Sequence, residues 1–245
     1  MSYPDFEDER HCLVFWARPP AAVRELIAEV QRRLLETAPE LWIMPPEGLH
    51  MTVLEVAHSL TATGVESLVQ RMGENVDTIV NITADEFETT SKRARLVRPL
   101  LNFDDSSLAL QWLPAASESP LDDYTYHHLR RDVHTAVRKA DLGVASRYVT
   151  PSAHLTICRF ISVNDLSRDR SGGGSIVNHA KVLKFVETIE EINAWLKAEF
   201  WPEADSPVVR KGGEWLVGVE KGLECRRGKL WYGGGERVRM GREIQ

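Results

Sequence analysis

The sequence predicts an α+β protein of two lobes, with central antiparallel sheets lining one cleft and helices outside. Short apolar runs typical of strands alternate with stretches of helical spacing. The order strand, helix, strand, helix also occurs once in each half of the chain. We therefore expect residues 1–245 to form a single, pseudo-twofold domain in which both lobes contain elements from each half. With 245 residues and 43% apolar content, the chain is large enough to bury a substantial core.

In the first half, we expect a strand at residues 11–17 and a helix at about 21–36. The helix has apolar residues three or four positions apart, as one buried face requires. These residues are Val23, Ile27, Val30 and Leu34. Two prolines and a glycine then precede a second apolar run, residues 49–57, which is the first motif-bearing strand. A predicted helix at about 64–74 completes this half.

The second half begins with residues 77–112, which are rich in β-forming side chains. Asp122 and Asp123 are expected to cap a helix that runs to about residue 140. A second extended apolar segment, residues 147–161, carries the second motif. The glycine-rich stretch 164–175 is predicted to be a flexible surface loop. The remaining predicted elements are a helix at 182–200 and strands at about 215–219 and 230–232.

The same four-residue motif occurs in both predicted strands. The first copy is His50-Met51-Thr52-Val53, and the second is His154-Leu155-Thr156-Ile157. Residues i and i+2 of a strand point to the same face, so each His and Thr should project together while their apolar neighbours face the core. Roughly 0.2 such tetrapeptides are expected by chance in a chain of this composition. Two copies in corresponding places of the two halves therefore indicate function more than a structural role.

Two neighbouring strands of this kind would aim two imidazoles and two hydroxyls at one point. One neutral imidazole can remove a proton from an attacking water or ribose hydroxyl, while a protonated one gives a proton to the leaving oxygen. Histidine suits both roles because its ordinary pKa of about 6.5 makes both forms available near neutral pH. The threonine hydroxyls can donate to phosphate oxygens. This chemistry cleaves a phosphodiester and requires no metal or cofactor.

With these two motifs the sequence resembles the 2H phosphoesterases, which include the LigT-type RNA 2′,3′-cyclic phosphodiesterases and plant cyclic phosphodiesterases. The resemblance extends to the Cys-Arg-Phe that follows the second motif and to the first strand, Val-Phe-Trp-Ala. It implies a two-lobed α+β fold with the motifs on central antiparallel strands. It also implies that His50, Thr52, His154 and Thr156 are catalytic and act on a 2′,3′-cyclic phosphate or on a short oligonucleotide.

The resemblance suggests two substrate-binding residues as well. Arg159 would help to hold the phosphate, and Trp16 would stack on a base. Strict strand alternation, however, places Arg159 on the face opposite His154, so a bulge or a twist would be needed to bring it into the site. From the residues alone, a core role for Trp16 is preferred to a base platform, whereas Arg159 is equally interpreted as a site residue and as half of a surface ion pair.

Composition narrows the class of partner. A net charge of −6 and a pI near 5.8 argue against gripping long duplex DNA, but leave a small nucleotide or an RNA end as the partner. Three scattered cysteines match neither a disulfide framework nor a metal site. The N-terminal residues resemble no signal peptide, and no run of about 18 apolar residues occurs. We expect a monomer without a membrane segment, located in the cytoplasm or also in the nucleus.

Several alternatives remain open at this point. His127 and His134 share a helical face, but their spacing does not match that of zinc helices, so we expect them to face solvent. The triple glycine at 172–174 lacks the lysine of a phosphate-binding loop. The same cleft also fits a catalytically silent module that binds a nucleotide or an RNA end. The same chemistry could act instead on a non-RNA cyclic phosphate, such as one derived from ADP-ribose.

Overall fold

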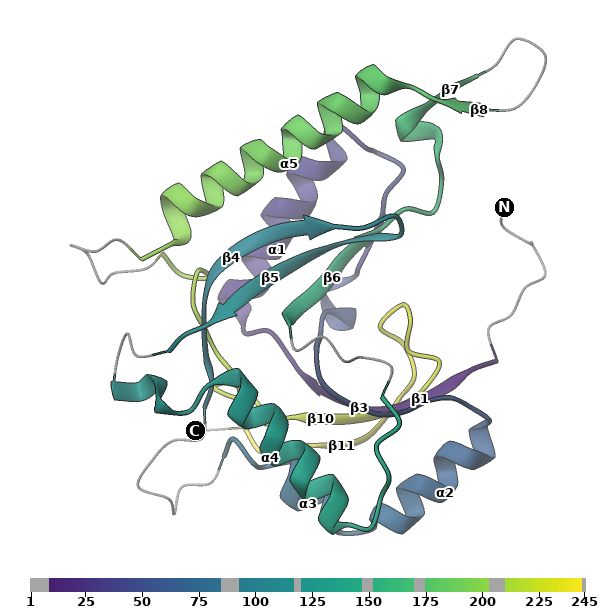
Figure 1. Cartoon of the computed structure of the whole chain (residues 1–245), viewed down its shortest axis with the longest axis vertical. Helices are drawn as coiled ribbons and strands as arrows, with labels where there is room; N and C mark the ends of the chain where they lie inside the picture. The colour runs from purple at the N-terminus through teal and green to yellow at the C-terminus, as the bar shows by residue number, and fades with distance from the viewer. Residues whose placement is uncertain are drawn as a thin grey trace.

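The computed structural model describes residues 9–84, 93–116, 120–146, 152–169, 175–202 and 210–243. These form a mixed α+β structure with two antiparallel sheets (Figure 1). Sheet A has the spatial order β11 (Glu236–Met240), β10 (Glu224–Gly228), β1 (His11–Ala17) and β3 (Met51–Leu60). Sheet B has the order β2 (Trp42–Ile43), β6 (Ala153–Arg159), β5 (Ser107–Pro114), β4 (Arg95–Phe103) and β9 (Trp215–Leu216). β7 (Ser167–Asp169) and β8 (Ser175–Val177) pair separately.

Helices cover the outer face of each sheet. α1 (Ala21–Leu35) and α5 (His179–Phe200) pack on sheet B, whereas α2 (Ala62–Met72), α3 (Asn75–Val80) and α4 (Tyr126–Lys139) pack on sheet A (Figure 1). Short 3₁₀ turns occur at η1 (Pro46–Gly48), η2 (Pro120–Asp123) and η3 (Asn164–Leu166). Among the helices of these described segments, none is both long enough and apolar enough to cross a bilayer.

The two sheets exchange helices. α1 follows β1 of sheet A but packs against β6 of sheet B, and α4 follows β5 of sheet B but packs against β3 of sheet A. One contiguous apolar core consequently runs through both layers. In α1 the buried positions include the four apolar residues that the sequence predicts for its core face. The exchange holds β3 and β6 against each other at the centre of the molecule.

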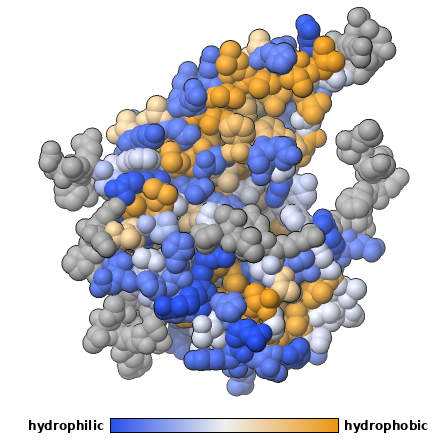
Figure 2. Space-filling model, viewed as in Figure 1, coloured by the Kyte–Doolittle hydropathy of each residue, from blue (hydrophilic) through white to orange (hydrophobic). Residues whose placement is uncertain are grey.

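The exposed apolar side chains are distributed unevenly over the surface. Hydrophobic residues gather over the β4–β5 hairpin and α5 in the upper part of the face in Figure 2. The exposed large apolar residues of sheet B and its surroundings include Phe103, Ile161, Val163 and Leu183. All three cysteines are buried and form no disulfide.

Some local expectations were wrong. The chain from Asp77 to Val80 belongs to α3 rather than to a strand. Thr125, not Asp122 or Asp123, caps α4, because its side chain and that of His128 form a reciprocal capping box. Asp122 is instead buried and accepts two hydrogen bonds from the Arg95 guanidinium. A long-range ion pair of this kind leaves no local sequence signal.

Two further predicted segments differ in the structure. Residues 230–232 lie in the turn between β10 and β11 and form no strand. The predicted flexible loop at 164–175 contains η3, β7 and the first residue of β8, while residues 170–174 lie outside the described part of the chain. Residues 147–151 of the second motif segment also lie outside it, so the described strand begins at Ala153.

Both motif strands are bulged immediately beside their threonine. In β3, Phe15 pairs with Leu54 and Trp16 with Thr52, which leaves Val53 as the extra residue. In β6, Leu108 pairs with Cys158 and Ala109 with Thr156. Ile157 is therefore the extra residue of β6. Each bulge reverses the side-chain alternation that follows it.

The carbonyl groups at these bulges are satisfied by buried polar side chains of the exchanged helices. Tyr126 of α4 donates its hydroxyl proton to the carbonyl of Thr52 at 3.0 Å. Gln31 of α1 donates to the carbonyls of Ile157 at 2.9 Å and Met44 at 3.0 Å. Backbone groups left without partners in the interior are costly, so these two helices stabilise the irregular strands.

Replacing Gln31 with leucine should lower the free energy of unfolding by about 1–3 kcal/mol. The Met44 carbonyl would lose its side-chain donor, and the Ile157 carbonyl would lose one of its two hydrogen-bond donors. Urea unfolding followed by tryptophan fluorescence measures this. The control is Gln70→Leu on the exposed surface of α2, which should stay within about 0.5 kcal/mol of wild type. Equal stability of the two variants would contradict the role assigned to Gln31.

Candidate active site

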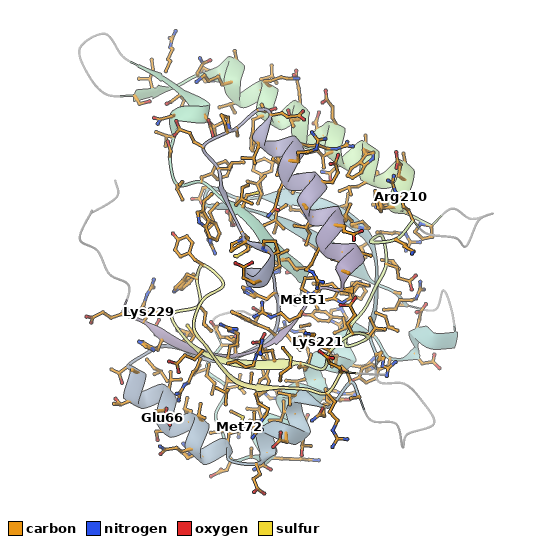
Figure 3. All side chains as sticks on the ribbon, turned by 180° about the vertical axis from the view of Figure 1, so that it is seen from behind. Met51, Glu66, Met72, Arg210, Lys221 and Lys229 are labelled. Atoms are coloured by element: carbon orange, nitrogen blue, oxygen red, sulfur yellow. The ribbon has the colours of Figure 1, made fainter. Side chains whose placement is uncertain are left out.

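A cavity of about 300 Å³ lies between the two sheets. Its walls come from β1, β3, β6 and the chain that joins β10 to β11. Figure 3 shows Met51, the first residue of β3, near the centre of the molecule. The residues lining the cavity are Cys12, Val14, Trp16, Met44, His50, Thr52, Glu55, His58, Ser59, His154, Thr156, Arg159, Leu230 and Trp231. All six residues singled out in the sequence are among them.

His50 is oriented by the backbone that precedes β3. Its Nδ1 lies 2.7 Å from the carbonyl oxygen of Gly48. A carbonyl can only accept, so Nδ1 carries the proton and Nε2 presents a lone pair. The pKa of His50 is lowered to about 3, chiefly by burial and also by the positive charges of Arg18 and Arg226, against the opposing effect of the Gly48 hydrogen bond. The imidazole is therefore neutral at pH 7.

Trp16 supports His50 from the neighbouring strand. Its ring stacks on the imidazole with centroids 3.6 Å apart and an angle of 15° between the planes. The indole is only 1% exposed. The guanidinium groups of Arg18 and Arg226 also lie over it, at 4.9 and 5.3 Å from the ring centroid. This packing favours the core interpretation of Trp16, in which it positions His50, over a role as a base platform.

The two arginines are held by one buried carboxylate. Glu224 is fully buried and forms ion pairs with Arg18, Arg226 and Arg237. Burial alone would raise the pKa of Glu224, but the hydrogen bonds from these arginines hold it below its ordinary value. Three cations around one anion leave an excess of positive charge beside Trp16 and His50. Such a site favours an anionic ligand.

Arg18 also organises the turn that holds His50. Its Nη1 donates to the carbonyl oxygens of Glu47 and Leu49, at 3.1 and 2.8 Å. These carbonyls flank Gly48, the acceptor for His50. The imidazole is thus fixed through a chain of contacts that begins at Glu224.

His154 and Thr156 project from β6 on the other side of the cavity. The Nδ1 of His154 lies 2.9 Å from the hydroxyl of Ser152 and 3.3 Å from its carbonyl oxygen. Burial lowers the pKa of His154, and the hydrogen bond to Ser152 opposes this shift. The charge of His154 also acts on His50. The two imidazoles are therefore close enough to influence each other's protonation.

Arg159 reaches the cavity because of the bulge at Ile157. The extra residue shifts the alternation by one, so that Arg159 shares a face with His154 and Thr156. Its Nη2 donates to the carbonyl oxygen of Trp231 at 3.0 Å. Its Nε is buried and, within the described part of the chain, has no hydrogen-bond acceptor. The same is true of Nε1 of Trp16.

Sequence reasoning missed several residues of the cavity. The bulges in β3 bring Glu55 and His58 onto the face of Thr52, three and six positions along. A spacing of three does not fit a regular strand, so alternation alone could not find Glu55, whereas His58 lies at an even spacing from Thr52. Ser146 donates to Glu55 at 3.3 Å. Trp231 arrives from a turn that was predicted as a strand.

The remaining candidates lie elsewhere. His127 and His134 are exposed on α4. The glycines at 172–174 fall outside the described residues. Within the ranges that the structure describes, no group of three or more His, Cys, Asp or Glu side chains is arranged to hold a metal ion.

Neither a protein-family model nor a curated protein matches the chain in sequence. Solved structures do match its fold. A conserved protein of unknown function from Agrobacterium tumefaciens, ATU0111, is 12% identical with a TM-score of 0.53, over 95% of this chain and 86% of that one. TT0787 of Thermus thermophilus is 14% identical with a TM-score of 0.48, over 94% and 96%. Usb1 of Kluyveromyces marxianus is 13% identical with a TM-score of 0.40, over 89% and 93%.

The Agrobacterium match shows that the likeness extends over nearly the whole chain and concerns the fold alone. The observed architecture is a mixed α+β structure with antiparallel sheets that place the two motif strands around one cavity. That is the coarse fold which the two motifs imply. In its fold, the chain is similar to the Agrobacterium protein ATU0111.

Proposed function

We propose that this protein is a metal-independent phosphodiesterase that uses His50 and His154 as its acid and base. Its substrate would be the 2′,3′-cyclic phosphate of a nucleotide or an RNA end, or a short oligonucleotide. The observation that carries the proposal is that both His-x-Thr pairs, from two different sheets, line one cavity. The positive charges of Arg18 and Arg226 near His50 support an anionic ligand in that cavity.

The tautomer of His50 suggests how the roles divide. Its Nδ1 proton is committed to the Gly48 carbonyl, so Nε2 can accept a proton from an attacking water. As the water oxygen bonds to phosphorus, one ring P–O bond breaks. The protonated His154 would then give its proton to the departing ribose oxygen. Thr52 and Thr156 would donate hydrogen bonds to the non-bridging phosphate oxygens, with Arg159 balancing their charge.

Binding of the phosphate would itself supply the protonated imidazole. Both histidines have lowered pKa values because burial disfavours their charged forms. A phosphodiester anion beside them favours the charged form and raises the pKa again. The site would therefore become competent for acid catalysis only when substrate is present.

Replacing either His50 or His154 with alanine should lower kcat/KM on 2′,3′-cyclic AMP by at least ~100-fold, because each removes a proton-transfer group. Hydrolysis followed by chromatography measures this, and a chelator should leave the wild-type rate unchanged. His127→Ala, on the exposed surface of α4, is the matched control and should keep full activity. Activity that survives both cavity substitutions would overturn the proposed chemistry. Nucleotide binding without turnover by the wild type would identify a binding module instead.

The pH dependence offers a second test. Because the folded-state pKa of His50 is about 3, below the ordinary 6.5, protonation favours the unfolded chain. The ligand-free protein should therefore lose stability as pH falls from about 6.5 towards 3. A bound adenosine 2′-monophosphate should raise the pKa of His50, which imidazole NMR titration with and without the ligand measures. A His50 signal that titrates near 6.5 in the empty protein would contradict the assigned environment.

A further inference from the structure

We propose that Trp231 forms the platform on which the nucleobase of the substrate stacks. This inference rests on the proposed function and specifies the part of the substrate that lies beyond the phosphate. Trp231 belongs to the β10–β11 loop, residues 229–235, and lines the same cavity as the two His-x-Thr pairs. The loop rises from sheet A towards sheet B (Figure 1), and Lys229 marks its beginning in Figure 3.

Trp231 differs from Trp16, the other tryptophan of the cavity, in its solvent exposure. Trp16 is 1% exposed, and its ring already contacts His50 and two arginines. Trp231 is 47% exposed. Among the cavity-lining residues that the structure describes, it is the one Trp, Tyr or Phe with a substantially exposed ring. An exposed indole at the edge of a phosphate-binding cavity is the side chain that stacks best on a base.

The loop is held in place from both lobes. On sheet A, Leu230 packs with the cavity-facing residues of β1. On sheet B, Arg159 donates a hydrogen bond to the Trp231 carbonyl. The rings of Tyr232 and Trp42 also pack edge to face, with centroids 5.0 Å apart. A platform fixed in this way binds a base without first having to be ordered.

Gly233 ties the loop to the turn that orients His50. It has a φ of +74°, and a Cβ there would lie 2.7 Å from the Cα of Gly48, so only glycine permits this approach. The Gly48 carbonyl accepts the Nδ1 proton of His50. The distance between the base platform and the imidazole is therefore set by direct backbone packing.

Charge near the loop agrees with a nucleotide ligand. The Arg10 guanidinium lies over the Trp231 ring, 5.1 Å from its centroid, and Arg159 lies 5.5 Å from the centroid of Tyr232. Cations interleaved with aromatic rings are typical of surfaces that bind single-stranded nucleic acid. With its phosphate at the two threonines, a nucleotide could place its base against Trp231.

The test compares two substrates that differ only in the base: 2′,3′-cyclic AMP and the 2,3-cyclic phosphate of methyl riboside. In Trp231→Ala, the ratio of kcat/KM for the first to that for the second should fall roughly 10- to 100-fold, mainly through KM, because the stacking contribution is lost. Trp231→Phe should restore most of the ratio. The control is Phe103→Ala, which removes an equally exposed ring, 52% accessible, at the end of β4.

The outcomes separate this inference from the proposed function. An unchanged ratio in Trp231→Ala, or the same fall in Phe103→Ala, would overturn the base platform even if the wild type is a phosphodiesterase. If the wild type hydrolyses neither compound, the proposed function fails. Calorimetry with adenosine 2′-monophosphate and ribose 2-phosphate then decides the platform: selective loss of affinity for the nucleotide in Trp231→Ala supports it, and equal affinities in all variants overturn it.

Discussion

The arrangement of the cavity depends on satisfying the backbone of two bulged strands. A bulge disrupts the ladder locally, and the interior carbonyl groups of Thr52 and Ile157 beside the two bulges each accept from a side-chain donor, that of Ile157 in addition to the backbone N–H of Met44. The two donors, Tyr126 and Gln31, come from helices that each cross to the opposite sheet. The crossing helices thus stabilise the irregularity and hold β3 against β6. Because the bulges reverse the alternation after each threonine, they also decide that Glu55 and Arg159 enter the cavity.

A second constraint is electrostatic. Glu224 is buried beneath three arginines, and two of these lie over Trp16, which in turn stacks on His50. Breaking such a network leaves an uncompensated buried charge, so its members depend on one another. The result is a neutral imidazole of defined tautomer in a positive environment. In the proposed mechanism, an anionic substrate would supply the negative charge that favours the protonated imidazole.

Much of the fold was predictable because its signals are local. The helix of residues 21–35 follows from apolar spacing, and the two motif strands follow from apolar runs bounded by turn residues. The errors have causes that are not local. Asp122 does not cap the helix because Arg95, a partner 27 residues away, binds its carboxylate, and Thr125 caps it instead. The apolar Leu230 and Trp231 were predicted as a strand, but they lie in a turn that contacts both sheets.

The sequence by itself determined which residue types recur at matching places: two histidines and two threonines on strands whose alternation directs each pair to one side. Tertiary structure alone decided that the two pairs share a cavity, since strands about a hundred residues apart meet only after both sheets and their exchanged helices have formed. It also decided the bulges, the environment of each imidazole and the position of Trp231. These depend on long-range hydrogen bonds, burial and backbone packing, none of which leaves a periodic signal in the chain.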